Sequence, residues 1–196
     1  MSRFNSRTSR NAALSGILST AGFLSTDWVV EYVPVLGTVL GILAFYLPGL
    51  LFAILVVAPG CPAHARPRRL RQAILLVGTV VVYWMTVELA VVLGELHPLR
   101  ATGTDALVEV LRVFSLSGVV GVLLLVGVLV AVVSLRPSRN QLILAGLSGL
   151  VGGTLLGCVD YVDPALERVL VGSGYLCWQW GVGVSLFQPR AVTVAA

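Results

Sequence analysis

Charged residues are scarce in this chain, and lysine is absent altogether. Only 11% of the residues are charged, against about 25% in an average soluble domain. Apolar residues make up 57% of the sequence, the mean hydropathy is +0.96, and apolar runs of about 20 residues recur along the chain. A run of that length crosses the hydrocarbon core of a bilayer. The composition therefore excludes an ordinary soluble domain and predicts an all-α membrane protein with several transmembrane helices.

The residue types that most catalytic and metal sites use are also few. The chain has two histidines, His64 and His97, and it lacks H-E-x-x-H and G-x-S-x-G motifs and a glycine-rich phosphate loop. Its three cysteines show neither C-x-x-C nor a metal-ligand spacing, so we expect them to be unpaired apolar side chains. We therefore expect no metal, no cofactor and no catalytic activity, with an intramembrane enzyme as a minor alternative.

Six apolar segments divide the chain, and only short connections separate them. The predicted spans are residues 11–30, 35–58, 73–96, 113–135, 142–159 and 169–187. The first is weak because serines, threonines and Asp27 dilute it, and a cleaved signal peptide is the alternative interpretation. Residues 106–112 are predicted to be helical and either lie at the interface or extend the fourth span. Residues 1–196 therefore form a single integral membrane domain, a bundle of six transmembrane helices.

Arginines and acidic residues fall on opposite sides of the predicted membrane. With the N-terminus inside and six crossings, ten of the thirteen arginines lie inside, and only Arg100, Arg112 and Arg168 lie outside. The nine acidic residues fall in the outside connections or in the half of a span next to them. The positive-inside rule then predicts both termini in the cytoplasm and a location in the cell membrane, plasma or bacterial inner. Topology also accounts for the net charge of +4, so we expect no binding to nucleic acid.

Small residues and a proline indicate how the spans pack. The fifth span carries glycines four residues apart, Gly149, Gly153 and Gly157, which make a smooth face for close helix contact in lipid. We expect this face to pack within the chain, with contact between copies in a homo-oligomer as the alternative. In the second span, Pro48 removes a backbone hydrogen bond and predicts a kink. Interruptions in the second and fifth spans are also compatible with the inverted repeats of a transporter, although a plain kink with packing glycines explains them too.

Glu88 is the most informative polar residue inside a predicted span. It lies eight residues before Leu96, which is about 12 Å below the outer edge of the span. A carboxylate facing lipid there costs at least about 2.5 kcal/mol, so we expect its side chain to point into the bundle. Helical spacing places Trp84 on the same face. Tyr175 and Gln179 add polar groups in the sixth span, and Glu88 is a candidate partner for Gln179.

Two classes of function follow from this carboxylate. Glu88 is either an ion or proton site, or a group that holds helices together by hydrogen bonding. The first predicts transport or permeation of a small solute or ion. The second fits a non-catalytic membrane subunit or scaffold, whose partners are the lipid bilayer and either a homo-oligomer or another membrane protein. A cavity shared by Glu88 and Gln179 favours transport, whereas a Gly153 face turned to lipid favours assembly.

Overall fold

Helices make up almost the whole of the structure. The computed structural model describes residues 3–32, 46–60, 68–96 and 104–187, and no strand occurs among them. The α-helices are α1 (Arg3–Tyr32), α3 (Ala58–Gly60), α4 (Arg68–Leu96), α5 (Thr104–Val133), α6 (Arg139–Gly157) and α7 (Pro164–Phe187). A π-helical turn, η1 (Ala53–Val57), precedes α3, and a 3-10 turn, η2 (Val159–Tyr161), precedes α7. Residues 46–52 are helical and continue through η1 into α3, so residues 46–60 are called the 46–60 helix.

Among the described residues, three helical segments are long and apolar enough to cross a membrane. They are Arg69–Leu93 in α4, Leu111–Val133 in α5 and Arg139–Gly157 in α6. The chain is therefore a membrane protein whose described part is all-helical, as its composition predicts, but the predicted bundle of six spans is not confirmed. Serines and Asn11 lower the hydropathy of α1, while glycines, tryptophans and Gln179 lower that of α7. The predicted second span starts at residue 35, and residues 35–45 lie outside the described part of the chain.

Local sequence explains where two of the helices begin. Ser138 caps α6, because its hydroxyl accepts from the Gln141 N–H at 3.3 Å and the Gln141 side chain accepts from the Ser138 N–H at 2.9 Å. Asp163 caps α7 by accepting from the two backbone N–H groups after Pro164, at 2.9 and 3.1 Å. α5 is continuous from Thr104, so the helix predicted over residues 106–112 extends the fourth span.

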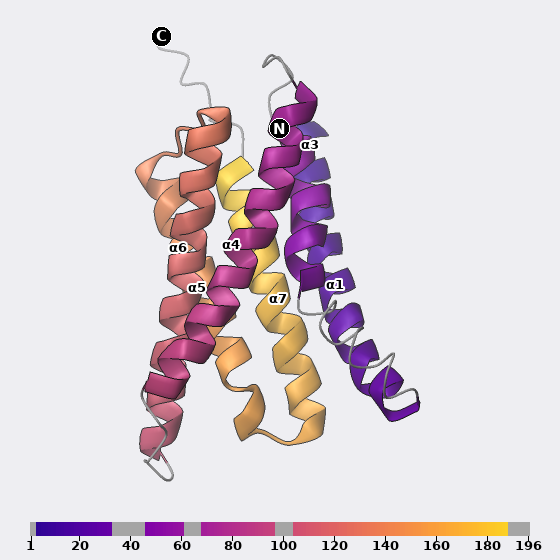
Figure 1. Cartoon of the computed structure of the whole chain (residues 1–196), viewed down its shortest axis with the longest axis vertical. Coiled ribbons are helices and arrows are strands. Elements are labelled where there is room, and N and C mark those ends of the chain that lie inside the picture. Colours follow the sequence, from indigo (N-terminus) through magenta and orange to yellow (C-terminus); the bar gives the residue numbers. More distant parts are fainter. Residues whose placement is uncertain (1–2, 33–45, 61–67, 97–103, 188–196) are drawn as a thin grey trace.

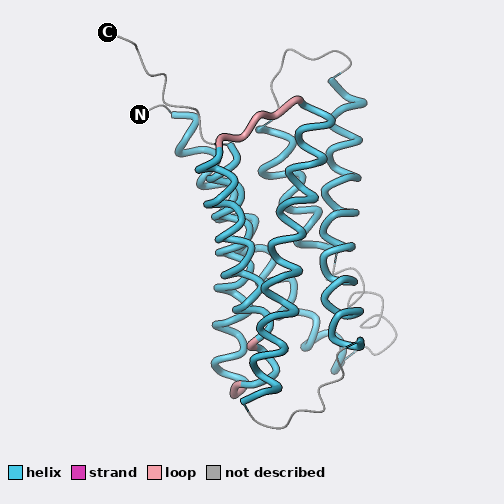
Figure 2. Tube along the Cα trace, turned by 90° about the vertical axis from the view of Figure 1, so that its left-hand side faces the viewer, coloured by secondary structure: helices cyan, strands magenta, loops and turns pink. Residues whose placement is uncertain are grey.

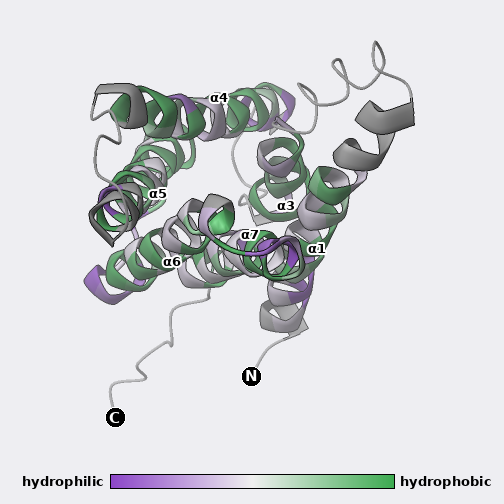
Figure 3. Ribbon diagram, turned by 90° about the horizontal axis from the view of Figure 1, so that it is seen from below, coloured by the Kyte–Doolittle hydropathy of each residue, from purple (hydrophilic) through white to green (hydrophobic). Residues whose placement is uncertain are grey.

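The helices pack in an order that follows the chain. α4 packs on α5, α5 on α6, α6 on α7, and α7 on α1, while η1 contacts both α1 and α4. The long helices stand side by side in Figures 1 and 2, with α4 running obliquely across the bundle in Figure 1. Seen from below in Figure 3, the 46–60 helix, marked by the label α3, lies between α4 and α1. Buried residues occur along α7 from Val171 to Phe187, so α7 is a central helix of the bundle.

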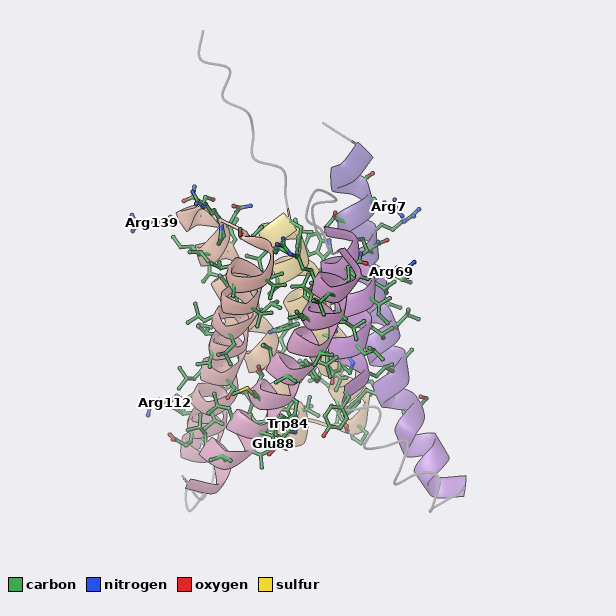
Figure 4. All side chains as sticks on the ribbon, turned by 45° about the horizontal axis from the view of Figure 1, so that its top comes forward. Arg7, Arg69, Trp84, Glu88, Arg112 and Arg139 are labelled. Atoms are coloured by element: carbon green, nitrogen blue, oxygen red, sulfur yellow. The ribbon has the colours of Figure 1, made fainter. Side chains whose placement is uncertain are left out.

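Arginine side chains gather at the two ends of the bundle. Figure 4 shows Arg7, Arg69 and Arg139 at one end and Arg112 toward the other. The start of α1 and the end of α7 also lie at the first of these ends. α4, α5, α6 and α7 run in alternating directions along the bundle (Figure 1). Arg69 and Arg139, near the starts of α4 and α6, therefore lie at one end, and Arg112, near the start of α5, lies toward the other.

Candidate functional site

α1 presents three polar side chains toward other helices. Asn11, Ser15 and Ser19 follow one another at intervals of four residues, which places them in a row along one side of the helix. Ser15 and Ser19 are fully buried. The low hydropathy of α1 therefore has a structural cause, because these polar residues face protein and not lipid.

Gln179 of α7 lies against this row and is 0% exposed. Its Oε1 accepts a hydrogen bond from the Ser15 hydroxyl, and its Nε2 donates to the Ser19 hydroxyl at 2.9 Å and to the Pro48 carbonyl at 3.2 Å. The Ser19 hydroxyl in turn donates to the Ser15 carbonyl at 2.8 Å. The amide nitrogen thus has two acceptors, the number that its two N–H groups can serve. One side chain joins α1, α7 and the 46–60 helix.

The 46–60 helix offers two backbone carbonyl groups to side chains of other helices, those of Pro48 and Leu55. In η1 the Ala58 N–H bonds to the Ala53 carbonyl, five residues back, instead of to a carbonyl four residues back. Pro59, four residues after Leu55, has no N–H to donate to the Leu55 carbonyl, and the Asn11 amide donates to this carbonyl at 2.9 Å. We call this set the polar junction: the side chains of Asn11, Ser15, Ser19 and Gln179 with the carbonyls of Pro48 and Leu55.

From the sequence alone, two parts of the polar junction are interpreted differently: Pro48 and the polar residues of α1. Pro48 is buried, but the kink predicted there involves residues before Tyr46, which lie outside the described residues, so the kink stays a prediction. Sequence reasoning interprets Asn11, Ser15 and Ser19 only as a weakness of the first span. Their four-residue spacing is the signal that this reasoning misses.

Aromatic side chains surround α7 next to the junction. Tyr175, one turn before Gln179, accepts a hydrogen bond from the Tyr83 hydroxyl of α4 at 3.3 Å. Trp178 lies edge-on to Phe52 and to Tyr83, with ring centroids 5.4 and 6.3 Å apart. Edge-to-face pairs of this kind add to the burial of aromatic surface. They hold α7 against α4 and the 46–60 helix.

Glu88 lies on the outside of the bundle, on the exposed side of α4 (Figure 4). Trp84, one turn earlier, donates from its indole Nε1 to Glu88 Oε1 at 3.0 Å, so the two share a face. The prediction that Glu88 points into the bundle is wrong. The inward side of α4 is occupied by Leu75, Thr79 and Tyr83, all buried, and helical geometry turns Glu88 away from them.

The residues predicted to form one intramembrane polar site therefore belong to three places. Gln179 is the centre of the polar junction, and Tyr175 pairs with Tyr83. Trp84 and Glu88 form a pair on the outer surface of α4. Glu88 bonds to Trp84 and is thus not the hydrogen-bond partner of Gln179.

The glycine row of α6 packs against α5 within the chain. A Cβ atom at Gly153 would lie 2.3 Å from the Phe114 carbonyl oxygen, and one at Gly149 would lie 2.6 Å from the Gly118 carbonyl oxygen. A Cβ atom at Gly157 would lie 2.8 Å from the Phe114 side chain. Only glycine permits such a close approach of two helix backbones. The row is used by this contact, so it does not offer a free face to a second copy.

Comparison with protein families, with curated proteins and with solved structures gave no match to this chain. Among the residues that the structure describes, no three His, Cys, Asp or Glu side chains gather as metal ligands. Over the same ranges, every buried side-chain nitrogen and oxygen has a hydrogen-bond partner. Two polar features of the described residues are candidates for function: the satisfied polar junction inside the bundle and the carboxyl–indole pair outside it.

Proposed function

We propose that this chain is a non-catalytic membrane subunit that binds another integral membrane protein through the outward side of α4. The observation that supports this function is the position of Glu88, more than one turn inside a candidate span and on its exposed side. The other charged residues of the three candidate spans lie within one turn of an end: Arg69, Arg71, Arg112 and Arg139. A charged side chain at the centre of a span costs about 2.5 to 3.5 kcal/mol on insertion scales. Even part of that cost makes the cover of another protein more favourable for Glu88 than exposure to lipid.

The outward surface of α6 provides the contrast. Away from the helix ends its exposed side chains are leucine, isoleucine and valine, such as Leu144, Leu147 and Val151, which acyl chains solvate well. The outward side of α4 instead carries an indole and a carboxyl group that bond to each other. A carboxylate has about four lone-pair sites, and the indole uses one of them. The remaining acceptor capacity of Glu88 is what a partner would satisfy.

Photo-crosslinking in native membranes tests this function. A photoreactive residue at Val81, 43% exposed on α4, should form covalent adducts with a protein, whereas one at Leu147, 52% exposed on α6, should react only with lipid. Val81 is chosen because the substitution leaves both Trp84 and Glu88 intact. Only lipid adducts at Val81, as at Leu147, would contradict the assembly function.

We further infer six membrane spans with both termini in the cytoplasm, in the plasma or bacterial inner membrane. The support is the arginine distribution, since ten of thirteen arginines fall in the termini and the inside connections of such a topology. A reporter fused after Ala196 should behave as cytoplasmic. In a variant whose native cysteines (Cys61, Cys158 and Cys177) are replaced by serine or alanine, a thiol reagent that cannot cross membranes should label Ala101→Cys from outside the cell but not Pro67→Cys. Labelling of Pro67→Cys from outside would overturn the topology.

Transport or permeation of a small solute or ion is the second candidate function, and the polar junction favours it. Transporters often bind their substrates where a membrane helix is interrupted and its carbonyls turn to side chains. The π-helical turn η1, with the Leu55 carbonyl bonded by Asn11, is an interruption of this kind. All the junction groups are partnered in this structure, so a substrate would have to replace one of their hydrogen bonds.

Flux measurements in proteoliposomes test this second function. If the junction binds the transported species, Ser19→Ala should reduce the flux severalfold, because it removes one acceptor of the Gln179 amide. Glu88→Gln should leave the flux unchanged, because Glu88 lies outside the junction. A flux that survives Ser19→Ala but falls in Glu88→Gln would reject the junction as the path.

A further inference from the structure

The outward side of α4 carries a regular row of exposed residues. Every one of the following is exposed, and the spacing alternates between four and three residues: Leu70, Ile74, Val77, Val81, Trp84, Glu88 and Val91. We call this row the α4 stripe. It runs along nearly all of the candidate span Arg69–Leu93, and Glu88 lies on the same side of the helix as Leu70, five turns earlier.

A spacing of four and three is the pattern by which two helices pack side by side. The average repeat of 3.5 residues keeps a seam facing a partner helix over several turns, with a crossing angle of about 20°. Copies of one membrane protein insert in the same direction. Two copies that meet through the α4 stripe across a twofold axis parallel to the membrane normal therefore bring α4 to α4 in parallel, and each residue meets its equivalent at the same depth.

The apolar members of the stripe do not by themselves distinguish a protein partner from lipid, but Glu88 does. Lipid offers no hydrogen-bond donor, whereas a second copy brings another Glu88 to the same depth. One carboxylic acid can donate to the neighbouring carboxylate, so two glutamates with one shared proton satisfy each other. Trp84 already donates to Oε1 and occupies the adjacent position of the stripe.

Over the described candidate spans, a second copy offers no arginine at this depth in place of the acid pair. In the described candidate spans the arginines stand at the ends, and Arg112 pairs with Glu109 at 3.6 Å. We propose that the α4 stripe is a self-association surface: a second copy of this chain covers it in parallel, with Glu88 paired to Glu88 of that copy. This inference rests on the proposed function, because it names the partner that the outward side of α4 binds.

Disulfide trapping in native membranes tests the self-association directly. In a chain whose native cysteines (Cys61, Cys158 and Cys177) are replaced by serine or alanine, Val77→Cys or Val81→Cys should form a dimer on oxidation with copper phenanthroline. Leu147→Cys, equally exposed but on α6, should stay monomeric under the same oxidation. No disulfide dimer at either stripe position, or equal dimer at Leu147→Cys, would overturn the inference.

Substitutions of Glu88 separate the carboxyl pair from simple apolar contact. An amide both donates and accepts, so Glu88→Gln should keep the dimer. Glu88→Leu should weaken it by about threefold to thirtyfold, the range that interhelical hydrogen bonds give in membranes, measured by energy transfer between labelled copies diluted into liposomes. Because Glu88 is exposed on the single chain, neither change should alter its melting temperature. Equal dimer in both variants would exclude the pair.

The outcomes for the two proposals differ. A protein adduct at Val81 that contains a different membrane protein, together with no disulfide dimer, would overturn self-association and leave the assembly function standing. Lipid adducts alone at Val81 with no disulfide dimer would overturn both. A disulfide dimer at Val77→Cys and Val81→Cys, with adducts between identical chains at Val81, supports both.

Discussion

Gly153→Leu should keep α5 and α6 from closing on each other, and the purified variant should lose its cooperative melting transition in detergent. A Cβ atom at Gly153 would lie 2.3 Å from the Phe114 carbonyl oxygen, and this atom belongs to a helix backbone that cannot rotate away. The smaller change Gly153→Ala should lower the free energy of unfolding by about 1–3 kcal/mol, the usual cost of overpacking a tight contact. Thermal unfolding followed by tryptophan fluorescence measures both.

Gly146 provides the matched control on the same helix. A Cβ atom there would meet nothing within 4 Å, so alanine adds no clash. Alanine is also favoured over glycine inside a helix by about 1 kcal/mol, so Gly146→Ala should melt at the same temperature as the parent or slightly higher. Gly153→Ala should therefore lower the melting temperature, whereas Gly146→Ala should not. Equal melting temperatures would mean that the α5–α6 crossing tolerates a wider separation than this structure has.

The glycine contact could be predicted from the sequence because small residues act locally. Spacing alone defines a face along which backbones can approach, and the structure puts that face against α5. The caps at Ser138 and Asp163 are local in the same sense, since each cap is formed by a few adjacent residues. Features of this kind need no knowledge of which helix lies next to which.

The direction of Glu88 could not be predicted, for a reason specific to membranes. In a soluble protein the polar face of a helix points outward, so hydropathy distinguishes inside from outside. On α4 both sides are apolar: Leu75 and Val82 are buried, while Val77 and Val81 face outward. The argument that a carboxylate avoids lipid is sound for the assembled protein. It does not say whether a neighbouring helix of the same chain or a second protein provides the cover.

The polar junction shows a second limit of hydropathy, which averages over all the residues of a span. Hydropathy counts Asn11, Ser15 and Ser19 as a weakness of the first span, although Ser15 and Ser19 are buried against α7. The partner of these two serines, Gln179, lies some 160 residues later in the chain, so no window of sequence contains the serines and the glutamine together. The sequence shows that Gln179 is a polar residue inside a predicted span. It does not show which helices pack against Gln179, so its partners could not be chosen.

Gln179→Leu should destabilise the chain by about 2–4 kcal/mol, because it removes one side chain that bonds to three groups on two other helices. The Ser15 hydroxyl loses its acceptor, and the Ser19 hydroxyl and the Pro48 carbonyl each lose a donor in a place that water does not reach. Gln179→Glu should be no better, since a carboxyl group keeps the acceptor but not the two N–H donors. Thermal unfolding in detergent measures the loss.

Trp180→Phe is the control on the same helix for Gln179→Leu. It removes a hydrogen bond between the same two helices, from the Trp180 indole to the Ser9 hydroxyl at 2.9 Å, but this bond is exposed and its loss should change the unfolding free energy by about 1 kcal/mol or less. Adding Ser15→Ala and Ser19→Ala to Gln179→Leu should recover most of the lost stability, because no hydroxyl then remains without its partner. Strictly additive losses across the three changes would mean that the amide and the two serines do not form one junction.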